Sequence, residues 1–223
     1  ICSGEQLSLM LSSDLDATDL KWTVTDNSGS VLTGVPTTGG NTSNFTFNNS
    51  IGSGDYYLLR LDEAGNEIWS QNYGSSSYEE LNALLPTSDG GFLMMGEFAP
   101  SYDKILLIKV DGQGQQEWMK SAGPNVGKTE GRDIKNTSDG GYIITGYTRP
   151  LGSNDDEDFY LIKLDENGEE VWDYKTGGQF DEFGEDVIQT SDGGYVSAGY
   201  KKLDNSTEGD LYLIKISETG DSL

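Results

Sequence analysis

Short apolar runs, each carrying one lysine, recur along the chain at 105–110, 159–164 and 211–216. In the run 159–164 every residue except Lys163 is apolar or aromatic, so neither face of a strand here would be polar. Strands with this pattern are covered on both sides. Asp165 and Gly168 follow, and an aspartate that opens a turn with glycine at its positive-φ position is typical of a short hairpin. The pattern therefore predicts a buried strand that leads into a tight hairpin.

A second kind of hairpin is predicted where Thr-Ser-Asp-Gly-Gly occurs, at 87–91, 137–141 and 190–194. An aromatic residue follows each copy, and the apolar or β-branched stretches on either side are typical of strands. We expect this motif to form turns and to serve the scaffold rather than a ligand. The residues to which we assign this structural role are Asp89, Gly90, Asp139, Gly140, Asp192 and Gly193.

The two kinds of hairpin alternate along the chain and form a repeat. Each repeat holds four strands in about 50 residues, which is the length of one β-propeller blade. Residues 55–223 therefore predict an all-β architecture of about three and a half propeller-type blades. Closed propellers need at least about four blades, so we expect a longer chain or another copy to supply the remainder.

Differences in length between the repeats are confined to the segments 98–103, 148–158 and 201–210. Each of these segments joins one hairpin to the other within a repeat, so we expect all of them to cluster on one face. Variable loops gathered on one face are where repeat proteins usually bind. The alternative is that they are surface loops without a ligand.

The net charge of the chain limits the kinds of partner that it can bind. It has 38 acidic and 14 basic residues and a formal net charge of −24, which repels the phosphates of nucleic acid. The sequence contains no apolar run long enough to cross a bilayer. We therefore expect neither a nucleic-acid partner nor a membrane span.

Histidine is absent and Cys2 is the single cysteine. These counts exclude Ser-His-Asp and Cys-His catalysis, zinc or copper held by histidine, and a disulfide within the chain. We therefore expect a protein that is not an enzyme, with no catalytic residues and no organic cofactor. A pair of carboxylates could still hydrolyse a glycoside, so a secreted carbohydrate-active enzyme is an alternative.

One stretch has the chemistry of a calcium loop. Asp204, Ser206 and Glu208 place oxygen-bearing side chains at alternate positions before a glycine. The glutamate that such loops carry at their last position is Lys215 here, so a plain solvated loop is the alternative. These three residues are the candidate metal ligands.

The spacing Asp-x-x-Gly-x-x-x-Trp, together with Thr-Ser-Asp-Gly-Gly and its following aromatic residue, resembles the β-propeller-like repeats of secreted and cell-surface proteins of Bacteroidota. The resemblance covers residues 55–223 and implies an exported protein. The tryptophan part is also similar to the docking motif of quinoprotein dehydrogenase propellers, in which the indole wedges one blade against the next. The resemblance implies this structural role for Trp69, Trp118 and Trp172.

Residues 1–54 lie outside the repeat and are rich in Ser, Thr, Asn and Gly. Their opening, and the stretch 20–24, resemble PKD-like immunoglobulin-type modules of the same kind of surface protein. Fifty-four residues are too few for a complete sandwich of that type. The segment is therefore either a truncated module or a donor of strands that complete the first blade.

Taken together, these features predict a non-catalytic extracellular or cell-surface protein that acts in adhesion, in binding a glycan or protein ligand, or in surface structure. A second interpretation is an extracellular filament subunit that assembles with further copies of itself through exposed blade edges. The carbohydrate-active enzyme is the third.

Overall fold

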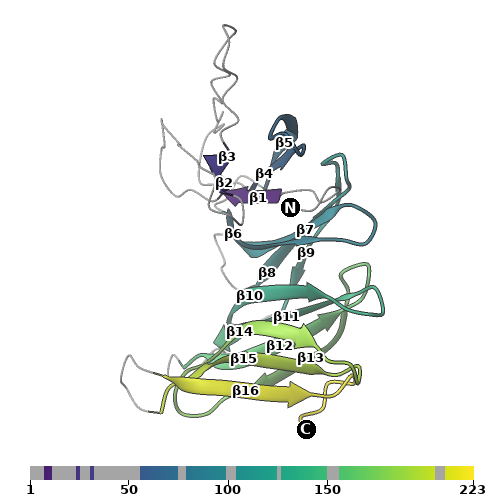
Figure 1. Cartoon of the computed structure of the whole chain (residues 1–223). Coiled ribbons are helices and arrows are strands. Elements are labelled where there is room, and N and C mark those ends of the chain that lie inside the picture. Colours follow the sequence, from purple (N-terminus) through teal and green to yellow (C-terminus); the bar gives the residue numbers. More distant parts are fainter. Residues whose placement is uncertain are drawn as a thin grey trace, which may run out of the picture. The chain divides into compact units, whose positions relative to one another are not determined.

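The computed structural model describes residues 8–11, 24–25, 31–32, 56–74, 79–98, 104–124, 127–149, 156–203 and 209–223 (Figure 1). Every regular element within these ranges is a β-strand, which confirms the all-β prediction. No helix among the described residues is long and apolar enough to cross a membrane. The chain divides into two compact units, Ile1–Tyr78 and Glu79–Leu223.

The first unit contains a sheet in the order β1-β4-β5 and a two-stranded pair, β2-β3. β1 pairs antiparallel with β4, with Ser8 opposite Arg60, so a strand from before the repeat enters the first sheet. The strands of this unit are β1 (Ser8–Leu11), β2 (Val24–Thr25), β3 (Val31–Leu32), β4 (Tyr56–Leu61) and β5 (Glu67–Tyr73).

The second unit contains three antiparallel sheets, in which strands that follow one another in sequence are neighbours. The first sheet comprises β6 (Glu79–Pro86), β7 (Phe92–Phe98), β8 (Ile105–Val110) and β9 (Gln116–Ala122). The second comprises β10 (Lys128–Asn136), β11 (Tyr142–Arg149), β12 (Asp158–Leu164) and β13 (Glu170–Thr176). The third comprises β14 (Glu182–Gln189), β15 (Tyr195–Lys201) and β16 (Asp210–Ile216). The prediction of four strands in two hairpins per repeat is therefore confirmed for the first two sheets.

Both kinds of predicted turn form as short hydrogen-bonded hairpins. In the second sheet, the amide of Thr137 donates to the carbonyl of Gly141 over 2.9 Å, and Gly140 has a φ of 89°. In the turn that follows, the carboxylate of Asp165 accepts hydrogen bonds from two backbone amides, each over 2.8 Å. The aspartate side chain accepts the hydrogen bonds that close the turn, and the glycine adopts the left-handed conformation. Both roles are those that the turn sequences predict.

A β-bulge interrupts the first strand of each of the three sheets at corresponding positions, next to Leu81, Gly131 and Gly184. The partner strand carries a glycine opposite the bulge. A Cβ added at Gly146 would lie 1.9 Å from the carbonyl oxygen of Glu130, so only glycine fits there. This close approach explains why a glycine recurs at the same distance after each Thr-Ser-Asp-Gly-Gly motif.

The core of the second unit lies between consecutive sheets. One apolar cluster joins the first sheet to the second and includes Leu107 and Ile162, while another joins the second to the third and includes Leu161 and Ile214. The first strands β6, β10 and β14 contact one another in turn. Because each sheet of this stack covers the next, the strands at its centre are apolar on both faces.

Candidate functional site

Each sheet of the second unit is a meander, in which adjacent strands run antiparallel and are joined in sequence order. Alternate connections therefore lie at the same end of the sheet. Both kinds of hairpin turn lie at one end, which we call the turn end. The strand ends that flank the segments of variable length lie at the opposite end, which we call the loop end. The two ends therefore separate the constant turns of the repeat from its variable connections.

At the turn end, the lysine of each apolar run pairs with the aspartate of Thr-Ser-Asp-Gly-Gly. The Lys163 ammonium is buried, lies 2.9 Å from an oxygen of Asp139 and donates to the carbonyl of Leu164 over 2.9 Å. Lys109 makes the same pair with Asp89 over 2.7 Å. The corresponding pair of the third sheet joins Lys215 to Asp192 over 2.8 Å. The sequence pattern places the lysines in strands and the aspartates in turns about 20 residues earlier, and it does not predict this pairing.

The second glycine of the motif leaves room for the ammonium group. A Cβ added at Gly141 would lie 2.7 Å from the Lys163 nitrogen and 2.2 Å from the carbonyl oxygen of Leu164. Burial opposes ionisation of Asp139, but hydrogen bonds from Thr137 and Lys163 lower the pKa of its carboxyl group to about 2. The motif thus serves both as a turn and as the counter-ion of a buried lysine.

Two tryptophans of the repeat lie against the turn of the following sheet. Trp118 of β9 packs on Gly168, where an added Cβ would lie 2.7 Å from the indole ring. Trp172 of β13 packs on Gly220 in the same manner, and its indole nitrogen donates to the carbonyl of Glu218 over 3.1 Å. Trp69 is half-buried in β5 of the first unit. The turn that follows the apolar run of one repeat, Asp165–Gly168 or Ser217–Gly220, is thus the contact surface for the tryptophan of the repeat before it.

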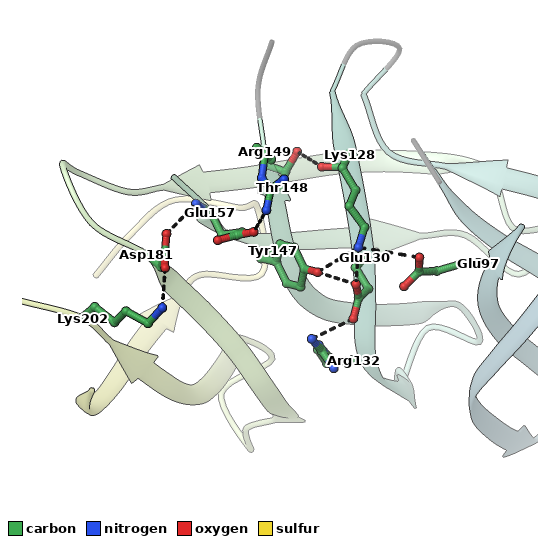
Figure 2. Close-up of polar contacts among 10 residues, drawn as sticks. All are labelled: Glu97, Lys128, Glu130, Arg132, Tyr147, Thr148, Arg149, Glu157, Asp181 and Lys202. Carbon is green, nitrogen blue, oxygen red and sulfur yellow. Dashed lines mark hydrogen bonds and ion pairs between the residues drawn. The ribbon is translucent and has the colours of Figure 1, made fainter. Parts of the chain in front are cut away.

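The loop end carries a cluster of charged side chains, centred on Glu130 (Figure 2). The Lys128 ammonium donates to Glu130 over 2.9 Å, and the Arg132 guanidinium pairs with its other oxygen over 2.8 Å. The Tyr147 hydroxyl also donates to Glu130, and Glu97 lies 3.9 Å from the Lys128 nitrogen. Residues of β7, β10 and β11 therefore meet in one hydrogen-bonded group.

The two carboxyl groups of this cluster differ in acidity. Burial, followed by the hydrogen bond and negative charge of Glu130, raises the pKa of Glu97 to about 7. Burial also opposes ionisation of Glu130, but hydrogen bonds with Glu97, Tyr147 and Lys128 hold its pKa below the usual range. Glu97 therefore carries the proton when the pair holds only one.

A second ionic chain extends the loop end toward the third sheet, as Figure 2 shows. Arg149, at the end of β11, pairs with Glu157. The Glu157 amide donates to Asp181 over 3.1 Å, and Lys202 donates to the other Asp181 oxygen over 2.6 Å. Arg149, Glu157 and Lys202 belong to the variable segments 148–158 and 201–210, so this chain of contacts is separate from the cluster around Glu130.

An open recess of about 450 Å³ lies beside the first cluster, within the second unit. Its volume falls in the range of small-molecule sites, but its lining is polar rather than apolar. The side chains offer both hydrogen-bond donors and acceptors. They are Glu80, Asn82, Glu97, Lys128, Glu130 and Arg132. Arg132 and Lys128 lie over the ring of Tyr147, at 5.4 and 5.6 Å from its centre, and occupy an aromatic face on which a ligand could otherwise stack.

The carboxyl pair of the recess does not have the spacing of a glycosidase. The carboxyl groups of Glu97 and Glu130 lie close enough for each to shift the pKa of the other. Catalytic carboxyl groups stand about 5 Å or more apart, so that a sugar or a water molecule fits between them.

The candidate calcium ligands Asp204, Ser206 and Glu208 lie outside the described residues. Within the described part of the chain, no group of three or more histidine, cysteine, aspartate or glutamate residues is arranged to hold a metal ion.

Comparisons with known proteins do not assign the chain to a family. No protein-family model matches it, and no curated protein matches it significantly.

Proposed function

We propose that this chain is a non-catalytic repeat protein of the extracellular space or cell surface, built of propeller-type blades, which binds a glycan at the loop end. Four-stranded meanders, contacts between successive first strands and tryptophans against the next turn support the blade assignment. The acidic composition and the resemblance to exported repeats support the location.

The open recess at the loop end is the observation that carries the binding proposal. A sugar presents hydroxyl groups that both donate and accept, and the recess offers carboxylates, an amide, an ammonium and a guanidinium. An acidic ligand is disfavoured because the protein has a net charge of −24. A neutral, hydroxyl-rich ligand suits both the mixed charges of the recess and the acidity of the whole chain.

A glycan array followed by calorimetric titration of the best glycan tests this proposal. Arg132 is partly exposed, so Arg132→Gln should leave the fold intact and weaken binding about tenfold or more, because a charged hydrogen bond to the ligand is lost. Lys120→Gln is the matched control, since it removes one positive charge and one ion pair at the turn end. The Lys120→Gln variant should bind the glycan with the same affinity as the unaltered chain.

Two results would contradict the proposal. One is the absence of binding to any glycan on the array. The other is an equal loss of affinity in the Arg132→Gln and Lys120→Gln variants, which would indicate a general effect of charge rather than contact in the recess.

A further inference from the structure

The outer face of the third sheet exposes large apolar side chains. Leu211 and Leu213 of β16 are 83% and 61% exposed, and Ile188 of β14 is 52% exposed. The strand register places all three on the same face, together with Val196 and Ala198 of β15. We call these five residues the terminal face.

The corresponding positions in the other two sheets are buried. The repeats can be aligned on their lysines, Lys109, Lys163 and Lys215. In this alignment Leu211 corresponds to Ile105 of the first sheet and Phe159 of the second. Leu213 corresponds to Leu107 and Leu161. None of these four counterparts is more than 1% exposed. In both cases the sheet that follows in the chain covers them. The terminal face thus has the composition of a sheet-to-sheet interface, and neither of the other two sheets of the second unit covers it.

We propose that the terminal face is covered by the terminal face of a second copy of this chain, in a symmetric dimer. Three of the eight large apolar side chains exposed among the described residues lie on this face. Ile68, Met119 and Val171 are each the single such residue of another sheet. Among the described residues, another copy of the terminal face is therefore the best apolar match, and a two-fold axis brings identical patches together.

Contact between faces is favoured over pairing between strand edges. The edge of β16 is already occupied at its carboxyl end, where Ser222 bridges Ile216 and the Leu223 amide donates to the Lys215 carbonyl over 3.0 Å. Edge pairing would have to displace these contacts or use the remaining part of the strand. Stacking of the faces leaves them intact and closes the assembly at two copies instead of extending it into a filament.

The charge of the chain determines how the dimer should respond to salt. Each copy has a net charge of −24, so the two copies repel one another at low ionic strength. Salt screens this repulsion and leaves apolar contact in place. The dimer should therefore become tighter as salt is added, whereas a contact made by ion pairs would weaken.

Sedimentation velocity across a wide range of protein and salt concentrations tests the proposal. The unaltered chain should form a dimer, and Leu211→Glu with Leu213→Glu should weaken dimerisation at least about 100-fold, because each dimer would bury four carboxylates. Met119→Glu with Val171→Glu is the matched control, since it adds the same charge at exposed apolar positions of the other sheets. Circular dichroism should show that both variants keep the fold, because the replaced side chains are exposed.

Loss of the dimer in the Leu211/Leu213 variant alone would support the proposal. Equal weakening in both variants, or a dimer that survives both, would overturn it. Filaments that persist in the Leu211/Leu213 variant would overturn it in favour of edge pairing. An unaltered chain that stays monomeric at every salt concentration would also overturn it. These outcomes do not depend on whether the recess binds a glycan.

Discussion

The turn end and the loop end of the second unit are built from the same strands but differ in how far their chemistry repeats. At the turn end, each sheet places a lysine from its third strand on the aspartate of its own first turn. At the loop end, Glu97, Tyr147 and Tyr200 occupy corresponding positions in the three sheets and have different partners. The repeat thus maintains its scaffold at one end and varies its chemistry at the other.

The chemistry repeats at the turn end and varies at the loop end because the two ends are under different physical constraints. The turn must reverse the chain in few residues and also neutralise a buried ammonium, and few sequences satisfy both requirements. At the loop end the connections vary in length, and the charged groups there pair between neighbouring strands of one sheet as well as between sheets. We expect substitutions at the turn end to affect stability most, and those at the loop end to affect titration and binding.

The largest expected effect is that of Asp139→Asn. The substitution keeps the shape of the side chain but removes the counter-ion of Lys163, whose side chain is only 4% exposed. An uncompensated buried ammonium should lower the free energy of unfolding by about 3 kcal/mol, as measured by urea denaturation. Asp192→Asn is the internal control and should cost less, because the Lys215 side chain is 26% exposed and can reach water. Equal losses would show that burial of the lysine does not set the effect.

A smaller effect is expected for Gly168→Ala, which tests the contact between consecutive sheets. The added Cβ would lie 2.7 Å from the Trp118 ring, and φ is +78°. Strain and overpacking together should cost about 2 kcal/mol. Gly90→Ala has a similar φ of +84° and no atom within 4 Å of the new Cβ, so it should cost only about 1 kcal/mol. A thermal or urea scan that finds no difference between the two would remove the tryptophan contact as a source of stability.

The smallest effect is expected for Glu97→Gln and depends on pH. The pKa of Glu97 is raised in the fold from an ordinary value of 4.5 to about 7. Folding therefore favours the protonated form, so this contribution to stability is complete below 4.5 and is lost as the pH rises through about 7. Because the pKa of its partner Glu130 is lowered, the net change should be about 1 kcal/mol.

The measurement for Glu97 is the free energy of unfolding as a function of pH. In the unaltered chain it should decline across this interval, and in Glu97→Gln the decline should be reduced. A variant whose pH profile is identical to that of the unaltered chain would show that Glu97 does not titrate in this range.

The sequence indicated the strands and turns of the repeat because they depend on neighbouring residues. Asp165 and Gly168 define a hairpin by their spacing, and the run 159–164 shows by its composition that it is covered on both faces. The cluster at the loop end was not predicted, because Glu97, Lys128 and Tyr147 belong to different strands and neither repeat nor match a known motif.

The all-β class, the four-stranded repeat and the two turns can be read from the sequence, since they follow from local composition and from a period that recurs along the chain. Three other features emerge only in the folded chain: the repeat lysines neutralise the turn aspartates, Glu97 and Glu130 meet in a polar recess, and Leu211 and Leu213 are exposed where their counterparts are buried. Ion pairs, pKa values and burial depend on groups brought together from distant parts of the chain, and spacing along the sequence does not specify those encounters.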